Sequence, residues 1–197
     1  MTFNFVYLAS GSPRRRELLR QIGVAFRLVR GSIDEAVLPR EPPVAYVTRL
    51  AAAKADAGWN TSRDAPVLAA DTVVVLNGKI LGKPAGRPEA EGMLKQLSGR
   101  THQVLTAVAL RTANGVRSRL SRSEVDFRPI DAAEARAYWD TGEPCDKAGA
   151  YAIQGKAAIF VADLRGSYSG VMGLPLFETA ELLAQAGVSR WRAAGTR

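Results

Sequence analysis

Carboxylates and lysines that could act together on a phosphate group are spread along most of this chain. Lysine and arginine side chains neutralise phosphate oxygens, and carboxylates hold Mg²⁺ through oxygen or accept a proton from an attacking water. Together they suit metal-assisted attack of water on a phosphoanhydride. Outside a basic turn near the N-terminus, the candidates are Glu35, Asp71, Asp146, Lys54, Lys83 and Lys147.

The basic turn is a candidate anion site. Residues 3–8 are strand-like, Ser12 suits a helix N-cap, and Pro13 fits the first helical position, where a missing N–H costs nothing. A helix N-terminus offers unpaired N–H groups and a partial positive charge. Arginines there oppose the helix dipole, so a bound phosphate would explain Arg14–Arg16 better than helix stability does. A solvated charged face is an equally good local explanation.

Asp71 interrupts the most apolar stretch of the chain. Residues 66–76 predict a central strand, and Asn77-Gly78 predicts the hairpin turn that follows it. An isolated buried carboxylate is costly unless it is paired, protonated or bound to a metal, so Asp71 needs a partner. Functional sites concentrate such groups, although backbone N–H groups at a strand bend could also satisfy it.

Three further charged residues have two interpretations each. Lys54 falls on the apolar stripe of a helix predicted over residues 44–55, so its ammonium either extends to an edge or points into a site. Glu35 follows a polar turn and is either an exposed loop carboxylate or a metal or base carboxylate. Lys83 lies in a tight turn after the hairpin and is either exposed or part of a site.

Composition excludes several chemistries. The 197 residues include one histidine and one cysteine, so neither an intramolecular disulfide nor a cysteine-based zinc site can form. His102 lies in a strand pattern and is interpreted as a structural or surface residue. Cys145 is interpreted as a loop residue without a catalytic role. No phosphate-binding P-loop or dinucleotide-binding glycine motif is present.

A net charge of +8 favours an anionic partner, namely nucleic acid, a nucleotide or a membrane surface. The arginines are scattered, and a small polyphosphate fits that distribution as well as a duplex does. No apolar run reaches the roughly 18 residues of a membrane helix, and no secretory signal is visible. These features predict a cytoplasmic protein with one domain over residues 1–197.

The other elements are predicted from periodicity and turn residues. Asp131 and Glu134 have capping-box spacing and begin a helix through Trp139. Residues 142–155 form a long glycine-containing loop, which is uncommon in a compact domain unless it binds something. Further helices begin at Pro13, Pro88 and Pro175, and further strands cover residues 24–29, 101–112, 115–127 and 157–164.

Seven stretches, in order, together resemble the Maf family of nucleoside triphosphate pyrophosphatases. The resemblance runs from about residue 6 to residue 185, which is nearly the whole chain. The matching stretches are LASGSPRR at 8–15, LAAAKA at 50–55, ADTVV at 70–74, LGKP at 81–84, LSGRTH at 97–102, DKAGAYAIQG at 146–155 and VMGLPL at 171–176.

The resemblance implies an α/β fold with an elongated mixed β-sheet flanked by helices. It implies two lobes around a central cleft, similar to the inosine triphosphate pyrophosphatase fold. It also implies cleavage of a nucleotide between its α and β phosphates, which yields a monophosphate and diphosphate. Asp71 matches the family's proton acceptor, and Arg14, Thr72 and Gln154 fall where the pyrimidine-preferring branch has its specificity residues. The branch that prefers 7-methylguanosine triphosphate typically has Ser-Asp-Gln at residues 70–72, so the resemblance favours dTTP and UTP here.

Other matches concern phosphate and metal. The resemblance implies a divalent cation, Mg²⁺ or Mn²⁺, with Glu35 and Asp71 as ligands. Whether Asp71 is the base, a metal ligand or both stays open. The family's phosphate- and metal-handling positions fall on Ser10, Ser12, Arg15, Glu35, Lys54 and Lys83.

The alternative function is a nucleic-acid-binding or cell-division regulatory protein without catalysis. Scattered arginines, the buried-looking Asp71 and the absence of interleaved aromatic residues argue against it. We therefore expect a small-molecule nucleoside triphosphate as the partner, with no stable nucleic-acid complex and no membrane association. The long strands could pair across a homodimer.

Overall fold

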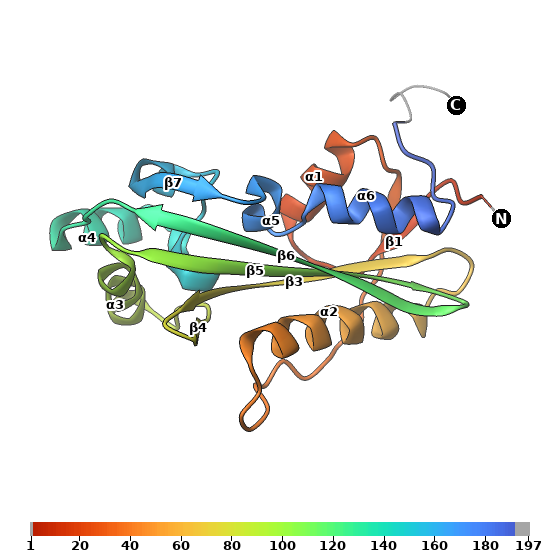
Figure 1. Ribbon diagram of the computed structural model, residues 1–197, viewed down its shortest axis with the longest axis horizontal. Helices are drawn as coiled ribbons and strands as arrows, with labels where there is room; N and C mark the ends of the chain where they lie inside the picture. The colour runs from red at the N-terminus through yellow and green to blue at the C-terminus, as the bar shows by residue number, and fades with distance from the viewer. Residues whose placement is uncertain (1, 192–197) are drawn as a thin grey trace.

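A computed structural model describes residues 2–191, which are organised around one mixed seven-stranded sheet (Figure 1). The strand order is β2-β1-β3-β5-β6-β7, and β4 pairs with β3. β1 runs parallel to β2 and β3, and the remaining pairs are antiparallel. The strands are β1 (Val6–Leu8), β2 (Phe26–Leu28), β3 (Val67–Leu76), β4 (Lys79–Leu81), β5 (Thr101–Thr112), β6 (Gly115–Phe127) and β7 (Val161–Arg165).

Helices cover both faces of this sheet. Figure 1 shows α2 on one face and α1, α5 and α6 on the other, with α3 and α4 at the end far from the chain termini. The helices are α1 (Pro13–Gln21), α2 (Pro43–Trp59), α3 (Arg87–Leu97), α4 (Ala132–Asp140), α5 (Tyr168–Met172) and α6 (Leu176–Gln185). The predicted α/β fold with an elongated mixed sheet is confirmed.

The alternation of side chains on β3 builds a core on each face. Val67 and Val73 pack in the cluster beneath α2, whereas Leu68 and Val74 join clusters on the opposite face. Successive residues of a strand point to opposite faces. Asp71 therefore faces α2, and the next residue, Thr72, faces the opposite side of the sheet.

A gap on one edge of β3 positions the site. On that edge β1 pairs with residues 67 and 68, and β4 pairs with residues 74–76. Within the part of the chain that the structure describes, no strand pairs with residues 70–73 on that edge. On its other edge β3 pairs with β5 throughout, so residues 70–73 have a strand neighbour on that edge only. Side chains from both faces can therefore reach the gap.

The prediction of a strand over residues 157–164 is partly wrong. Lys156–Phe160 is a 3₁₀ turn, and β7 begins only at Val161. The Glu143 carboxylate accepts hydrogen bonds from the backbone N–H groups of Lys156 and Ala157, which holds this stretch in a turn. Two further boundaries differ: β2 is shorter than residues 24–29, and α2 extends to Trp59. The strands predicted at 101–112 and 115–127 are confirmed.

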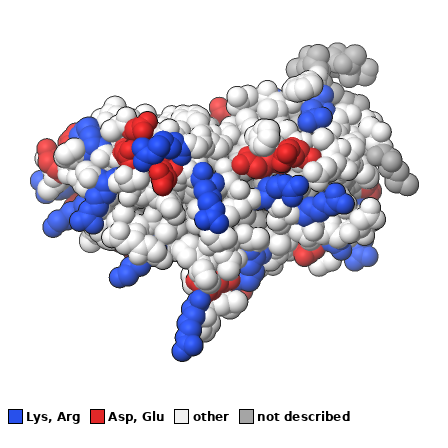
Figure 2. Space-filling model, in the orientation of Figure 1, with Lys and Arg blue, Asp and Glu red and all other residues white. Residues whose placement is uncertain are grey.

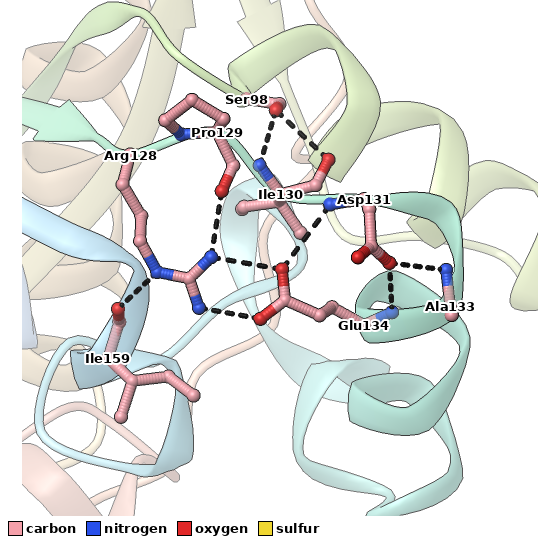
Figure 3. A network of polar contacts seen from close by, with 8 residues as sticks. All are labelled: Ser98, Arg128, Pro129, Ile130, Asp131, Ala133, Glu134 and Ile159. Carbon is pink, nitrogen blue, oxygen red and sulfur yellow. Dashed lines mark hydrogen bonds and ion pairs between the residues drawn. The ribbon is translucent and has the colours of Figure 1, made fainter.

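The capping box predicted at the start of α4 is confirmed (Figure 3). Asp131 accepts from the backbone N–H groups of Ala133 and Glu134, both at 2.8 Å, and Glu134 accepts from the Asp131 N–H. Arg128 donates two hydrogen bonds to the Glu134 carboxylate and a third hydrogen bond to the carbonyl of Ile159. These contacts join the end of β6 to α4 and to the turn before β7.

Candidate active site

A cleft of about 1110 Å³ opens at the gap on the edge of β3. It is lined by the turn before α1, by α2, by the middle of β3, by the turn after β4, and by the loop that follows α4. All of the residues predicted to act on substrate or metal line this one cleft. They are Ser10, Ser12, Arg14, Arg15, Glu35, Lys54, Asp71, Thr72, Lys83 and Gln154.

Lys54 links two carboxylates in this cleft. Its Nζ lies 2.6 Å from Asp71 Oδ1 and 2.8 Å from Glu35 Oε1. Asp71 is only 8% exposed, so its charge requires this partner. The hydrogen bond from Lys54 is the main cause that holds the pKa of the Glu35 carboxyl below its usual value. The Lys54 ammonium therefore points into the cleft and does not extend to an edge of the helix.

The sequence suggests that the Ser12 side chain caps α1, but the turn before α1 is arranged differently. Ser12 occupies the N-cap position, but its side chain makes no capping hydrogen bond. Its backbone N–H instead donates to Ser10 Oγ at 3.2 Å. The hydroxyl of Ser12 is therefore not needed by the helix.

Arg15 is largely committed to the protein. Its Nε donates to the carbonyl of Gly173 at 2.7 Å, Nη1 to Ser10 Oγ at 3.1 Å, and Nη2 to Thr72 Oγ1 at 3.4 Å. Burial lowers the pKa of the Arg15 guanidinium, and the negative charge of Asp71 partly opposes that shift. An arginine has five N–H donors, so two stay available to a ligand. Arg15 thus holds the turn before α1 in place as well as lining the cleft.

Further cations line the cleft, and three of them come from separate elements. Arg14 lies on α1, Lys83 in the turn after β4, and Lys147 in the loop after α4. Burial lowers the pKa values of Arg14 and Lys147, and the charge of Arg14 lowers the pKa of Lys147 further. Lys147 forms an ion pair with Asp146. A bound anion near Lys147 would favour its charged form.

Glu143 supports the segment that carries Gln154, and sequence reasoning did not find it. Its Oε1 accepts from the Tyr138 hydroxyl at 2.7 Å, and its carboxylate also accepts the N–H groups that follow Gly155. Tyr138 in turn accepts from the N–H of Ala152 at 3.2 Å. The carboxylate lies against Gly155, where any Cβ would overlap it. The one sequence feature that could have indicated this support is Gly155, because a glycine directly after Gln154 allows a close contact there.

His102 has a structural role, as its sequence position indicated. It is 2% exposed, and its Nε2 lies 2.9 Å from the hydroxyl of Tyr151. Burial lowers the pKa of His102 from 6.5 to about 4, so the ring is neutral at pH 7. Cys145 is exposed on the loop after α4. Neither residue is arranged as a nucleophile or base of the cleft.

Comparison with known proteins assigns the family. A family model described as Maf-like protein matches residues 5–186. The chain belongs to the Maf family. This Maf protein is 56% identical over 196 residues to the dTTP/UTP pyrophosphatase of Aromatoleum aromaticum, with 92% of this chain and 95% of that protein covered. It is 51% identical over 199 residues to the dTTP/UTP pyrophosphatase of Nitrosomonas europaea, with 94% and 96% covered.

A solved structure agrees with the fold of this Maf protein. A HAM1 protein from Coxiella burnetii matches with a TM-score of 0.50 at 19% identity, and the match covers 93% of this chain and 100% of that one. At this identity the likeness concerns the fold alone. Across residues 2–191, no helix is both long and apolar enough to span a membrane.

Proposed function

We propose that this Maf protein hydrolyses dTTP and UTP to the nucleoside monophosphate and diphosphate. The observation that carries the proposal is the Lys54–Asp71 pair, which sits in a cleft lined by Arg14, Lys83 and Lys147. A buried carboxylate beside a cluster of cations suits a base that acts on a polyphosphate. Relatives above 50% identity that carry the name dTTP/UTP pyrophosphatase support the same conclusion.

In the proposed mechanism Asp71 accepts a proton from a water molecule, and the oxygen of that water attacks the α-phosphorus. A new P–O bond forms, the bond between the α-phosphorus and the bridging oxygen breaks, and diphosphate leaves with the bridging electron pair. Lys54 forms an ion pair with Asp71 and fixes its orientation through their 2.6 Å contact. Arg14 and Lys83 neutralise the charge that grows on the phosphate oxygens.

A divalent cation fits the same residues. Glu35 and Asp71 both contact Lys54 Nζ, so their carboxylates converge on the point that the Lys54 ammonium occupies, and a bound cation would share these carboxylates with Lys54. Mg²⁺ is commonly bound through one or two carboxylates together with substrate phosphates, which agrees with a pair of protein ligands here. No group of three or more His, Cys, Asp or Glu side chains suited to a metal occurs within residues 2–191. Mg²⁺ or Mn²⁺ held by Glu35 and Asp71 would supply charge neutralisation at the phosphates.

We assign base recognition to Thr72, Gln154 and Arg14, which line the same cleft. Thr72 is partly buried on β3, and Gln154 is exposed in the loop supported by Glu143. Both side chains can hydrogen-bond an edge of a pyrimidine. A site that recognises a ligand by hydrogen bonds rejects analogues strongly, because a mismatch leaves polar groups unpaired.

The nucleic-acid alternative has little support on the surface. On the face drawn in Figure 2, Lys and Arg side chains are interspersed with Asp and Glu and form no continuous basic stripe. A nucleotide that meets several separate cations of the cleft would account for part of the net charge of +8. We also propose a cytoplasmic location, in keeping with a single exposed cysteine. The homodimer stays a prediction, which gel filtration with light scattering would test.

The deciding experiment measures diphosphate release from a panel of purine and pyrimidine nucleotides by wild type and Asp71→Asn, with and without Mg²⁺ or Mn²⁺. We expect a preference for dTTP and UTP, dependence on the cation, and a fall in kcat of roughly 10²–10⁴-fold in the variant. Comparable turnover by Asp71→Asn would refute the base assignment, and a purine preference would refute the substrate assignment. Tight, strongly salt-dependent duplex binding without hydrolysis would favour the alternative.

A further inference from the structure

Gln154 is one of the two central residues of a tight turn in the cleft. The N–H of Gly155 donates to the carbonyl of Ala152 at 2.9 Å and closes this turn. Ala152 and Ile153 are each only 5% exposed, whereas the side chain of Gln154 is exposed and lines the cleft. The place of Gln154 in the cleft is therefore set by whatever holds the two ends of the turn.

One pair of side chains, Tyr138 and Glu143, holds both ends. At the first end the Tyr138 hydroxyl accepts from the N–H of Ala152 at 3.2 Å and donates to Glu143 Oε1 at 2.7 Å. At the second end the Glu143 carboxylate accepts from the N–H groups of Lys156 at 3.0 Å and Ala157 at 3.3 Å. Burial raises the pKa of Tyr138, so its hydroxyl stays protonated and can donate. A continuous chain of hydrogen bonds thus joins the two ends behind Gln154.

We infer that Tyr138 and Glu143 are positioning residues that hold Gln154 against the base and so select pyrimidine over purine nucleotides. The inference rests on the proposed function, in which Gln154 contacts the base. A turn that is held at both ends keeps Gln154 at a fixed depth in the cleft, and a purine needs more room there because it has a second ring. A turn released at one end can move back and admit the larger base.

Two other roles could explain the same contacts. Glu143 could act through its charge, because that charge opposes the lowering of the pKa values of Arg14 and Lys147 by burial. Alternatively, the pair could only stabilise the fold, and its loss would then slow the hydrolysis of all nucleotides equally. Tyr138→Phe separates these roles, because it removes the hydroxyl that holds Ala152 but leaves the charge of Glu143 in place.

The experiment compares kcat/KM for dTTP and dGTP, measured as diphosphate release, in wild type, Tyr138→Phe, Glu143→Gln and Gln154→Ala. In Glu143→Gln an amide NH₂ replaces one acceptor oxygen, so whichever way the amide lies, a donor faces another donor. We expect each variant to lose roughly tenfold of the wild-type preference for dTTP. In the Gln154→Ala background Tyr138→Phe should change the ratio no further, because the residue that it positions is absent.

Two matched controls alter residues that do not line the cleft. Tyr7→Phe removes a tyrosine hydroxyl that donates to Asp64 on the surface at 3.5 Å. Glu134→Gln weakens the ion pair with Arg128, which joins α4 to the end of β6. Both controls should keep the wild-type ratio. Thermal unfolding of every variant separates a change in specificity from a loss of the fold.

Three results would overturn the inference while leaving the pyrophosphatase assignment intact. They are an unchanged ratio in Tyr138→Phe, an equal effect of Tyr138→Phe with and without Gln154, and an unchanged ratio in Gln154→Ala. The last variant replaces an exposed side chain, so the inference stays testable if Tyr138→Phe and Glu143→Gln do not fold. Release of no diphosphate from dTTP by the wild type would instead refute the proposed function itself.

Discussion

Lys54 and Asp71 meet at 2.6 Å, where α2 packs on one face of β3. Asp71 is almost fully buried there, and Lys54 is the cation that compensates it. The pair lies at the gap between β1 and β4, where the sheet leaves the middle of β3 without a neighbour on one side. The same gap lets Thr72, on the opposite face of the strand, reach the cleft.

Removal of Lys54 should destabilise the protein through Asp71. In Lys54→Met the carboxylate stays buried without its cation, and we expect a loss of roughly 3 kcal/mol in the free energy of unfolding. Urea unfolding without added divalent metal measures this, because a metal could replace the ammonium. The double variant Lys54→Met/Asp71→Asn should recover much of the loss. Lys79→Met, at an exposed lysine on β4, is the control and should change stability by less than about 0.5 kcal/mol.

Lys83 should act on substrate binding rather than on folding. Lys83 and Lys79 are both exposed and lie four positions apart, but only Lys83 lines the cleft. We expect Lys83→Ala to raise the KM for dTTP by about tenfold or more, because a charged hydrogen bond to phosphate is lost. The effect should weaken at high salt, since the site is open to solvent. Steady-state kinetics that gave Lys79→Ala and Lys83→Ala the same KM would contradict the assignment.

Much of the site can be predicted from the sequence, because each element that carries a site residue is specified by a short stretch of neighbouring residues. The strand around Asp71, the turn before α1 and the α2 stripe that carries Lys54 each follow from residue type and spacing. That these parts share one cleft does not follow from them, because β1 reaches β3 through long-range pairing, whereas β4 is the local hairpin partner of β3. The gap between them depends on register, which no local pattern specifies.

The supporting residues were missed for a related reason. Thr106, which donates a hydrogen bond to the Thr72 hydroxyl, looks like an ordinary β-branched strand residue, and Thr72 is 34 positions away. Glu143 looks like an exposed loop acid, yet it fixes N–H groups 13 and 14 positions further on. Residues that act by holding other residues have no motif of their own. Only the fold brings them into contact with what they support.

The glycine after Gln154 gives a test of the support from Glu143. Gly155→Ala should destabilise the protein by about 1–3 kcal/mol, because the added methyl group overlaps the Glu143 carboxylate. Gly92→Ala is the matched control: no atom lies within 4 Å of its Cβ position, and alanine should stabilise α3 by about 0.5–1 kcal/mol. Thermal unfolding measures both. If Gly155→Ala is as stable as wild type, the close contact does not constrain the loop.

His102 should make stability depend on pH below neutrality. Its pKa is about 4 in the folded protein against an ordinary value of 6.5, so between these values the unfolded chain binds more protons. Stability is therefore complete above pH 6.5 and falls as the pH drops towards 4, by up to about 3 kcal/mol. Burial of the ring causes this shift, and the nearby charge of Asp126 opposes it only partly.

The measurement is urea unfolding at several pH values between about 7.5 and 4.5, compared between wild type and His102→Gln. Carboxylates also titrate in this range, but they contribute to both proteins and cancel in the difference. Because the chain has a single histidine, the remaining difference belongs to His102. We expect His102→Gln to be less stable than wild type at pH 7.5, because it loses the ring contacts with Phe127 and Tyr151, and to lose less stability on acidification. Parallel curves for the two proteins would mean that the histidine titrates normally and is not held neutral by the core.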